Sequence, residues 1–254
     1  MANMKIGIFD SGLGGLVILK AIRERLPEYD YLYYGDTKHL PYGDKSPEEI
    51  YELTLAGVEF LFKQDCALII LACNTASAQA LRRIQQDWLP LHYPARRVLG
   101  VIIPTAEAVC ADPTLKTVGI LATQATVASE TFIKEIAKLN PELTVVQQAA
   151  PKLVPLIENG RYHELPDVLE EYIPPLLKAG AQAILLGCTH YPLIREAIED
   201  ACGSGIRVIA QTDIVPASLA AYLTRHPEIV ETLTRGGSQR MVYTDPPGTV
   251  LHDA

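Results

Sequence analysis

The sequence predicts an α/β fold built from two similar units, each with a largely parallel sheet covered by helices. Short apolar segments alternate with amphipathic helical segments along the whole chain, which is typical of βαβ units. An apolar run breaks off into small polar residues at Leu68–Ser77, and the same design returns at Ala183–Pro192. Lys5–Ser11 also aligns with Thr117–Thr123.

These repeats indicate an internal duplication. Ser11 precedes Cys73 by nearly the same number of positions as Thr123 precedes Cys188. We therefore expect two domains related by a pseudo-twofold axis, with an active site between them. The first domain is expected to comprise residues 1–99 and 211–254, and the second residues 100–210. Chance similarity of two βαβ units is the alternative.

The expected elements of the first domain follow from apolar runs, capping residues and prolines. Its strands are expected at Lys5–Phe9, Tyr31–Tyr34, the run that ends at Cys73, and Val98–Ile103, which Pro104 stops. Its helices are expected up to about Leu26, from about Pro47 to Lys63, and after Cys73 up to Trp88, with Leu89–Arg97 as a connection. Ser46-Pro47-Glu48-Glu49 is a strong helix start, because Ser caps the helix, Pro opens it and Glu stands at the third position.

The second domain shows the same alternation. Its strands are expected at Thr117–Leu121, Thr144–Gln147, the run that ends before Cys188, and Arg207–Ala210. Its helices are expected after Thr126 up to about Leu139, and at Val154–Glu158 and Leu165–Lys178. After it come a helix over Ile214–Leu223 and an edge strand at Arg240–Thr244, which Pro246-Pro247 end.

Composition points to a cytoplasmic enzyme-like protein. The 254 residues carry a formal net charge of −8 at pH 7, which argues against a nucleic-acid partner because phosphate binding needs clustered Lys and Arg. The apolar runs are too short to span a membrane, and Met1–Lys5 has no signal-peptide character. Five cysteines without short-spaced pairs suit a reducing compartment.

Cys73 and Cys188 are the strongest candidates for chemistry. Each follows a buried strand and precedes hydroxyl or amide side chains, at the sheet edge where α/β proteins bind ligands. A helix N-terminus behind each sulfur favours the thiolate. The alternative is that each cysteine only fills the core, as free cysteines often do. Two cysteines in matching contexts weaken this alternative. Cys66, Cys110 and Cys202 lack this setting and are expected to be structural.

Asp10 and Ser11 follow the first strand and begin a glycine-rich turn. Plain turn chemistry is one explanation. A dinucleotide fingerprint is excluded because Val17 stands where it needs Gly or Ala, and no Walker pattern exists. We expect the Asp10 carboxylate to act on a cationic group or a proton.

His190, two residues after Cys188, suits proton transfer because imidazole titrates near neutrality. An ordinary loop histidine is the alternative. A zinc site made by Cys73, Cys188 and His190 is a further alternative, but the chain has no cysteine pair at the spacing of a zinc site. Glu158 lies at a helix end and is uninformative by itself.

Taken together, these motifs resemble the glutamate racemase family of cofactor-independent amino-acid racemases over nearly the whole chain. The motifs that carry the resemblance are Asp10–Gly15, Gly35-Asp36 with Pro41-Tyr42-Gly43, Cys73–Ser77, Pro151–Gly160 and Gly187–Pro192. Aspartate-type members usually have His at the place of Ser77 and Glu at the place of His190. This chain follows the glutamate pattern at both places.

The resemblance implies a two-cysteine isomerase that needs no cofactor or metal and supplies D-glutamate for peptidoglycan. It implies that Cys73 takes the α-proton from D-glutamate with help from Asp10, and Cys188 from L-glutamate with help from His190. Glu158 is implied as a helper. The implied substrate contacts are Asp10, Ser11, Tyr42, Gly43, Asn74, Thr75, Thr123, Thr189 and His190. The resemblance also implies a homodimer.

Ala122-Thr123 and Gln211-Thr212 depart from the family's usual Gly-Thr and Asp-Ser. They leave the cysteines untouched but affect the expected pocket shape. A racemase for another amino acid, a non-enzymatic regulator with this fold and a zinc hydrolase are the rival functions.

Overall fold

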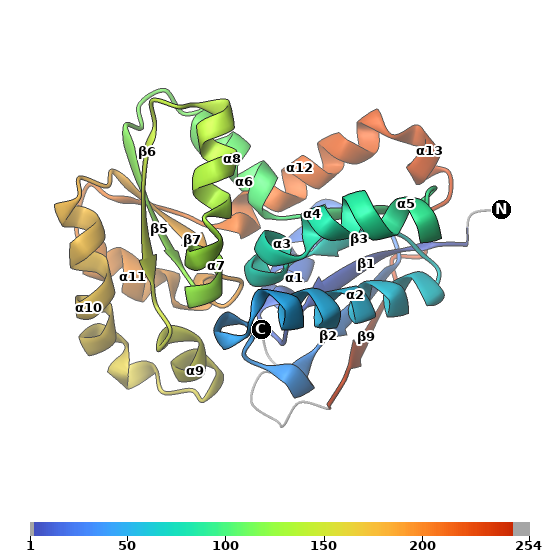
Figure 1. Cartoon of the computed structure of the whole chain (residues 1–254), viewed down its shortest axis with the longest axis horizontal. Helices are drawn as coiled ribbons and strands as arrows, with labels where there is room; N and C mark the ends of the chain where they lie inside the picture. The colour runs from blue at the N-terminus through green and yellow to red at the C-terminus, as the bar shows by residue number, and fades with distance from the viewer. Residues whose placement is uncertain (1–2, 246–254) are drawn as a thin grey trace.

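The computed structural model, which describes residues 3–245, contains two parallel sheets side by side, each flanked by helices (Figure 1). The first sheet has the strand order β4-β3-β1-β2-β9 and the second has the order β6-β5-β7-β8. All the strand pairings within them are parallel. The predicted α/β class with two parallel sheets is confirmed.

The elements of the first sheet and its helices alternate as expected from the sequence. They are β1 (Lys5–Asp10), α1 (Gly15–Arg25), β2 (Tyr31–Gly35), α2 (Pro47–Lys63), β3 (Cys66–Leu71), α3 (Asn74–Gln79), α4 (Leu81–Arg83), a π-helical turn (Ile84–Trp88), α5 (Leu89–His92) and β4 (Arg97–Gly100). Short 3-10 turns at Thr37–His39 and Tyr42–Asp44 shape the loop after β2. The capping box at Ser46 is formed: its side chain accepts from the Glu49 N–H, and Glu49 in turn accepts from the Ser46 N–H.

The second sheet repeats this arrangement, and the chain then returns to the first. Its elements are α6 (Ile102–Cys110), β5 (Thr117–Ala122), α7 (Gln124–Ser129), α8 (Thr131–Leu139), β6 (Thr144–Ala149), α9 (Leu153–Glu158), α10 (Leu165–Lys178), β7 (Ala183–Gly187), α11 (Arg195–Cys202) and β8 (Arg207–Ile209). The returning elements are α12 (Gln211–Arg225), α13 (Pro227–Val230) and β9 (Gln239–Tyr243).

The two sheets share one strand order. Replacing β1, β2, β3 and β4 by β5, β6, β7 and β8 converts the first order into the second, with β9 added at one edge. This correspondence is what the predicted duplication requires. Because all strands are parallel, the carboxyl ends of β1 and β3 lie at one edge of their sheet, as those of β5 and β7 do in theirs.

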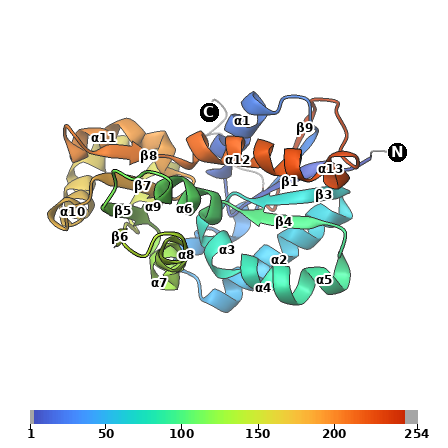
Figure 2. The ribbon, with the colours of Figure 1, turned by 90° about the horizontal axis from the view of Figure 1, so that it is seen from above.

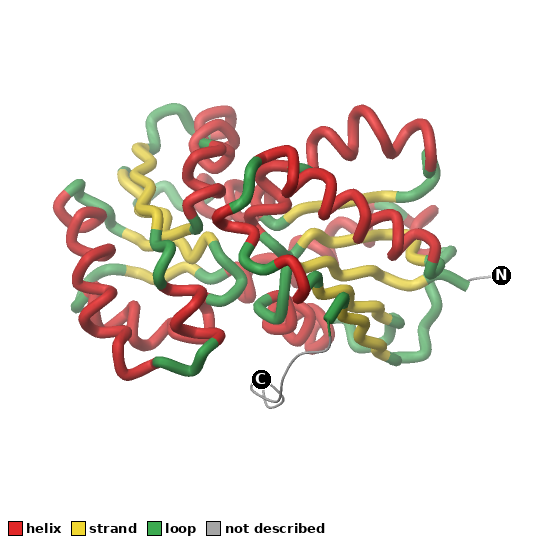
Figure 3. The backbone as a smooth tube through the Cα atoms, turned by 60° about the horizontal axis from the view of Figure 1, so that its bottom comes forward, coloured by secondary structure: helices red, strands yellow, loops and turns green. Residues whose placement is uncertain are grey.

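Helices cover both faces of each sheet (Figure 2, Figure 3). Successive residues of β3 show why, since Leu68 and Ile70 pack in the core with α1 and α12, whereas Ile69 and Leu71 pack in the core with α2 and α3. In the second unit α9, α10 and α11 cover one face, and α6 and α8 the other. Strands buried on both faces explain the continuous apolar runs of the sequence.

The predictions for three segments were wrong in part. The strand predicted at Val98–Ile103 ends at Gly100, and Ile102 begins α6, with Pro104 in its first turn where no backbone N–H is needed. The single helix expected up to Trp88 is divided into α3, α4 and the π-helical turn. The expected connection at Leu89–Arg97 contains α5.

The predicted domain boundaries stay a prediction. α12 packs against α1, and β9 pairs with β2, so these returning elements contact the first unit. Residues 1–2 and 246–254 of the predicted first domain, with the predicted stop at Pro246-Pro247, lie outside the described residues. Within residues 3–245, no helix has the length and apolar character needed to cross a bilayer.

Candidate active site

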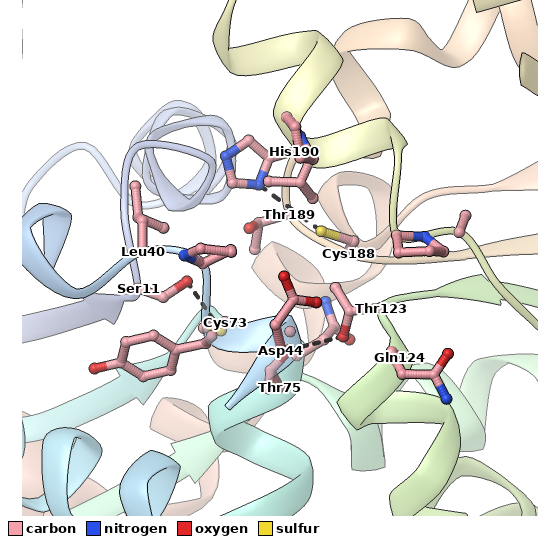
Figure 4. A pocket seen from close by; sticks show the side chains of 18 residues that line it. Ser11, Leu40, Asp44, Cys73, Thr75, Thr123, Gln124, Cys188, Thr189 and His190 are labelled. Atoms are coloured by element: carbon pink, nitrogen blue, oxygen red, sulfur yellow. Dashed lines mark hydrogen bonds between the residues drawn. The ribbon is translucent and has the colours of Figure 1, made fainter. Parts of the chain in front are cut away.

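A narrow pocket lies where the strand ends of the two units meet, with a cavity volume of about 40 Å³ (Figure 4). Ten residues singled out from the sequence line it: Ser11, Tyr42, Gly43, Cys73, Asn74, Thr75, Thr123, Cys188, Thr189 and His190. Asp10 and Glu158 lie behind this lining and bond to residues within it. The structure thus brings every predicted site residue into one cluster.

Cys73 comes from the first unit, two residues after β3, and is buried. Its sulfur donates to Ser11 Oγ over 3.4 Å and accepts from the backbone N–H of Ala76 at 3.5 Å, at the start of α3. Burial, together with the negative charge of Asp10, raises the pKa of Cys73 to about 12, although the two hydrogen bonds oppose this. At neutral pH Cys73 is therefore a thiol that can donate a proton.

Cys188 comes from the second unit, directly after β7, and is backed by a histidine and a carboxylate. His190 Nδ1 lies 3.8 Å from the Cys188 sulfur, and His190 Nε2 lies 2.9 Å from Glu158 Oε1. Burial lowers the pKa of His190, but its bonds to Cys188 and Glu158 outweigh burial and raise the pKa to about 10. At neutral pH an imidazolium therefore stands beside the sulfur of Cys188.

The two thiols thus have opposite surroundings. Cys73 lies near the carboxylate of Asp10, and Cys188 lies near the cation of His190. A base and an acid that reach one pocket from two units can remove and return a proton on opposite sides of a bound molecule.

Asp10 is fully buried at the end of β1 and connects the two units. Its carboxylate accepts from the backbone N–H of Gly12 at 3.0 Å and from Thr189 Oγ1 at 3.3 Å. Burial raises the pKa of Asp10, while the nearby His190 charge and these hydrogen bonds lower it, and the net direction is upward. The Asp10 carboxylate therefore has hydrogen bonds to the turn at Gly12 and to Thr189. It acts on Cys73 through its negative charge.

The glycine-rich turn after Asp10 allows close approach of the second unit. A Cβ added at Gly14 would lie 2.6 Å from both His190 Nδ1 and Thr189 Oγ1. A side chain at this position would push the loop of Cys188 away. Gly14 therefore serves packing between the units.

Threonine hydroxyls join the units on the other side of the pocket. Thr75 Oγ1 and Thr123 Oγ1 are 2.9 Å apart, and Thr123 Oγ1 donates to Thr126 Oγ1 at 2.9 Å. Gly43 packs directly on Thr123, since an added Cβ would lie 3.0 Å from Thr123 Cβ. These hydroxyls and the loop after β2 form a polar wall.

Sequence reasoning missed part of the lining. The missed residues are Leu40, Asp44, Gln124 and Ala150, and Pro41, Pro151, Val154 and Pro155 were noted only as positions within motifs. Gln124 directly follows Thr123, so its place in the sequence could have identified it. Val154 and Pro155 at the start of α9 carry no polar signal.

The zinc alternative gains no support from geometry. In the part of the chain that the structure describes, no three His, Cys, Asp or Glu side chains cluster closely enough to hold a metal ion.

Comparisons with known proteins show the family of this chain. The family model described as Asp/Glu/Hydantoin racemase matches residues 17–219. The chain is 42% identical to the glutamate racemase of Ruegeria pomeroyi, covering 99% of this chain and 95% of that one, and 40% identical to that of Dinoroseobacter shibae, covering 99% and 94%. The crystal structure of glutamate racemase from Francisella tularensis in complex with D-glutamate superposes with a TM-score of 0.86 at 34% identity, covering 97% of this chain and 90% of that one.

The fold and the paired thiols define an isomerase of the amino-acid racemase class. The chain belongs to the Asp/Glu/Hydantoin racemase family.

Proposed function

We propose that this protein interconverts L- and D-glutamate by a cofactor-independent two-base reaction. The observation that carries the proposal is the pair of thiols, Cys73 and Cys188, which reach one pocket from equivalent strand ends of two similar units. The relatives named glutamate racemase support glutamate as the substrate.

In the direction from L-glutamate, Cys188 is the base and Cys73 the acid. The Cys188 thiolate takes the α-proton, and the Cys73 thiol delivers its own proton to the opposite face. The products are D-glutamate, a Cys188 thiol and a Cys73 thiolate. The reverse direction exchanges the roles, and proton exchange with solvent resets the pair for another turnover in the same direction. The unequal surroundings of the two sulfurs support this starting state.

His190 and Glu158 act behind Cys188, and Asp10 acts behind Cys73. The imidazolium of His190 stabilises the Cys188 thiolate, and Glu158 stabilises the imidazolium through their 2.9 Å contact. The carboxylate of Asp10 keeps Cys73 protonated until its proton is needed. Asp10 also fixes Thr189 beside the substrate.

Hydroxyl and amide groups bind the substrate carboxylates and the planar carbanion-like centre. No Arg or Lys belongs to the described lining. Recognition is therefore assigned to the backbone N–H groups at the starts of α3 and α7, to Tyr42 and Gly43, and to the polar side chains in the lining. These side chains are Ser11, Asn74, Thr75, Thr123 and Thr189.

The test is α-proton exchange of L- and D-glutamate in D2O, with racemisation followed by circular dichroism and no cofactor added. Wild type should racemise both enantiomers, and Cys73→Ser and Cys188→Ser should each lose at least about 100-fold, since general acid–base catalysis contributes roughly 10² to 10⁴ in rate. Cys110→Ser is the matched control, because Cys110 lies outside the pocket lining. Absence of exchange with either enantiomer in wild type would rule out glutamate as the substrate.

The biological role and the assembly remain proposals drawn from the resemblance. The protein would act in the cytoplasm and supply D-glutamate for bacterial peptidoglycan. The expected homodimer can be checked by analytical ultracentrifugation.

A further inference from the structure

Gln211 forms a buried polar contact that the reaction described above does not use. It is the first residue of α12 and is 1% exposed. Its Nε2 donates to Asn74 Oδ1 at 2.8 Å, and Asn74 Nδ2 donates to Gln211 Oε1 at 2.7 Å. Gln211 Nε2 also donates to Thr105 Oγ1 at 3.3 Å. Two side-chain amides are thus paired reciprocally.

These three residues lie where the chain crosses between the two sheets. Thr105 belongs to α6, which follows the last strand of the first half, and Gln211 opens α12, which leads back from β8. α6 and α12 pack against each other at this junction (Figure 2). Asn74 directly follows Cys73 and lines the pocket. Gln211 therefore connects the two chain crossings, at α6 and α12, to Asn74, the residue next to the Cys73 thiol.

We propose that Gln211 is a positioning residue that sets the place of Cys73 relative to Cys188 by holding Asn74. Gln211 does not belong to the described pocket lining, so it acts through Asn74. Because Cys73 and Asn74 share a peptide bond, a shift of the Asn74 backbone also moves the Cys73 sulfur. The two thiols come from different sheets, and their separation depends on contacts at the junction. The catalytic consequence rests on the proposed racemase function.

An apolar side chain at position 211 would break this link. Leucine has similar bulk, but it would leave the buried Asn74 amide without its partner, and a buried unsatisfied polar group costs roughly 1–3 kcal/mol. The Asn74 backbone would shift to bring its amide to another partner, and Cys73 would move with it. The side chain of Cys188 contacts His190 in the second unit, so it should be unaffected.

Gln211→Glu gives a second variant that can be switched by pH. A protonated carboxyl group offers one donor and one acceptor and pairs with an amide as glutamine does. An ionised carboxylate has no donor, so one of its oxygens would face Asn74 Oδ1. Burial should raise the pKa of this introduced carboxyl above its ordinary value of about 4.3. The native arrangement should therefore hold below that raised pKa and be lost above it.

The experiment measures the rates at which iodoacetamide alkylates Cys73 and Cys188 in the full chain, from pH 5 to 9, by peptide mass spectrometry without glutamate. Gln211→Leu should change the ratio of the two rates by at least about 3-fold at every pH, on the scale of one lost net hydrogen bond. Gln211→Glu should match wild type at low pH and depart from it as pH rises. In racemisation assays, kcat/KM of Gln211→Glu should fall by about 10-fold over the same pH range in which its alkylation ratio differs from wild type, in line with one unsatisfied buried group.

Thr212→Ala is the matched control, because Thr212 lies on the same turn of α12 and its hydroxyl donates to Asp213 Oδ1. This variant should keep the wild-type ratio. An unchanged ratio in folded Gln211→Leu, or a Gln211→Glu ratio that does not depend on pH relative to wild type, would overturn the proposal. If Gln211→Leu fails to fold, the pH dependence of Gln211→Glu decides. Since alkylation needs no substrate, failure of glutamate racemisation would leave this test readable.

Discussion

Glu158 Oε1 lies 2.9 Å from His190 Nε2, on the side of the imidazole that faces away from Cys188. The contact is screened from solvent, because the side chain of His190 is 3% exposed and that of Glu158 is 22% exposed. A carboxylate behind a buried imidazole stabilises its protonated form. Glu158 therefore controls the charge beside Cys188 without belonging to the pocket lining.

Glu158→Gln should make the enzyme lose activity at lower pH than wild type. The pKa of His190 is about 10 in the folded protein, above its ordinary value of 6.5, so the imidazolium persists through neutral pH and is lost as the pH rises through about 10. Removing the Glu158 charge lowers that pKa, and the alkaline limb of kcat/KM should shift to lower pH. NMR titration of His190 provides the measurement.

Glu164→Gln is the control for this change, since Glu164 is paired with Arg161 outside the pocket lining. Its alkaline limb should match that of wild type. If Glu158→Gln also matched wild type, the assigned role of Glu158 would be wrong.

The two thiols should react in a fixed order with iodoacetamide. Burial and the charge of Asp10 raise the pKa of Cys73 to about 12, whereas Cys188 has the imidazolium of His190 at 3.8 Å from its sulfur. At pH 8, peptide mapping should therefore find Cys188 alkylated before Cys73, because the thiolate is the reactive form and Cys73 is held as a thiol. Cys66, whose pKa burial also raises to about 12, is an internal control for slow labelling. Faster labelling of Cys73 would contradict the proposed starting state.

The sequence predicts most of the sheets and both thiols because local patterns carry that information. A strand buried on both faces needs a continuous apolar run, and the polar residues after Leu71 and Gly187 mark where such runs end. The same rule misassigned Val98–Ile103, since a short apolar run does not distinguish a strand from the start of the buried helix α6.

Contacts between distant residues could not be predicted in this way. Gln211 and Asn74 are 137 positions apart and meet only because two chain crossings pack together. Asp44 and Val154 enter the pocket lining from opposite units, and although each lies in or beside a motif, nothing in the sequence shows that its side chain faces the other unit. Such positions depend on how the units sit against each other, which no local pattern encodes.

Gly14→Ala should reduce activity strongly while leaving each sheet intact. The φ of Gly14 is −58°, which any residue adopts, so the effect is steric. The added Cβ would lie 2.6 Å from His190 Nδ1 and force the loop of Cys188 outward. A misplacement of about 1 Å can cost roughly 100-fold in rate, and kcat/KM should fall by about that factor. Steady-state kinetics, with circular dichroism as the check on folding, provide the measurement.

Gly12→Ala is the comparison, because its added Cβ would meet the flexible methyl groups of Leu40. Its loss should be smaller than that of Gly14→Ala. Equal losses would show that the approach of His190 to Gly14 is not the limiting contact.

Asp30→Asn should loosen the attachment of β9 in a pH-dependent way. The Asp30 carboxylate accepts from Ser238 Oγ at 2.6 Å and from the backbone N–H groups of Ser238 and Gly236 at 2.8 and 3.2 Å. Burial raises the pKa of Asp30, but these bonds, with one from Thr234, outweigh it and lower the pKa to about 2. Because this value lies below the ordinary 3.8, the carboxylate stabilises the fold above pH 3.8, and the contribution is lost as pH falls to 2.

Urea unfolding should therefore show a pH-dependent difference between Asp30→Asn and wild type. At pH 7 the variant should be less stable by about 1–3 kcal/mol, the cost of unsatisfied buried donors, and the difference should shrink as pH falls from 4 to 2. Asp200→Asn, on the exposed side of α11, should leave the free energy of unfolding within about 0.5 kcal/mol of wild type. A difference for Asp30→Asn that stays constant across this range would mean that the charge of Asp30 does not hold the segment before β9.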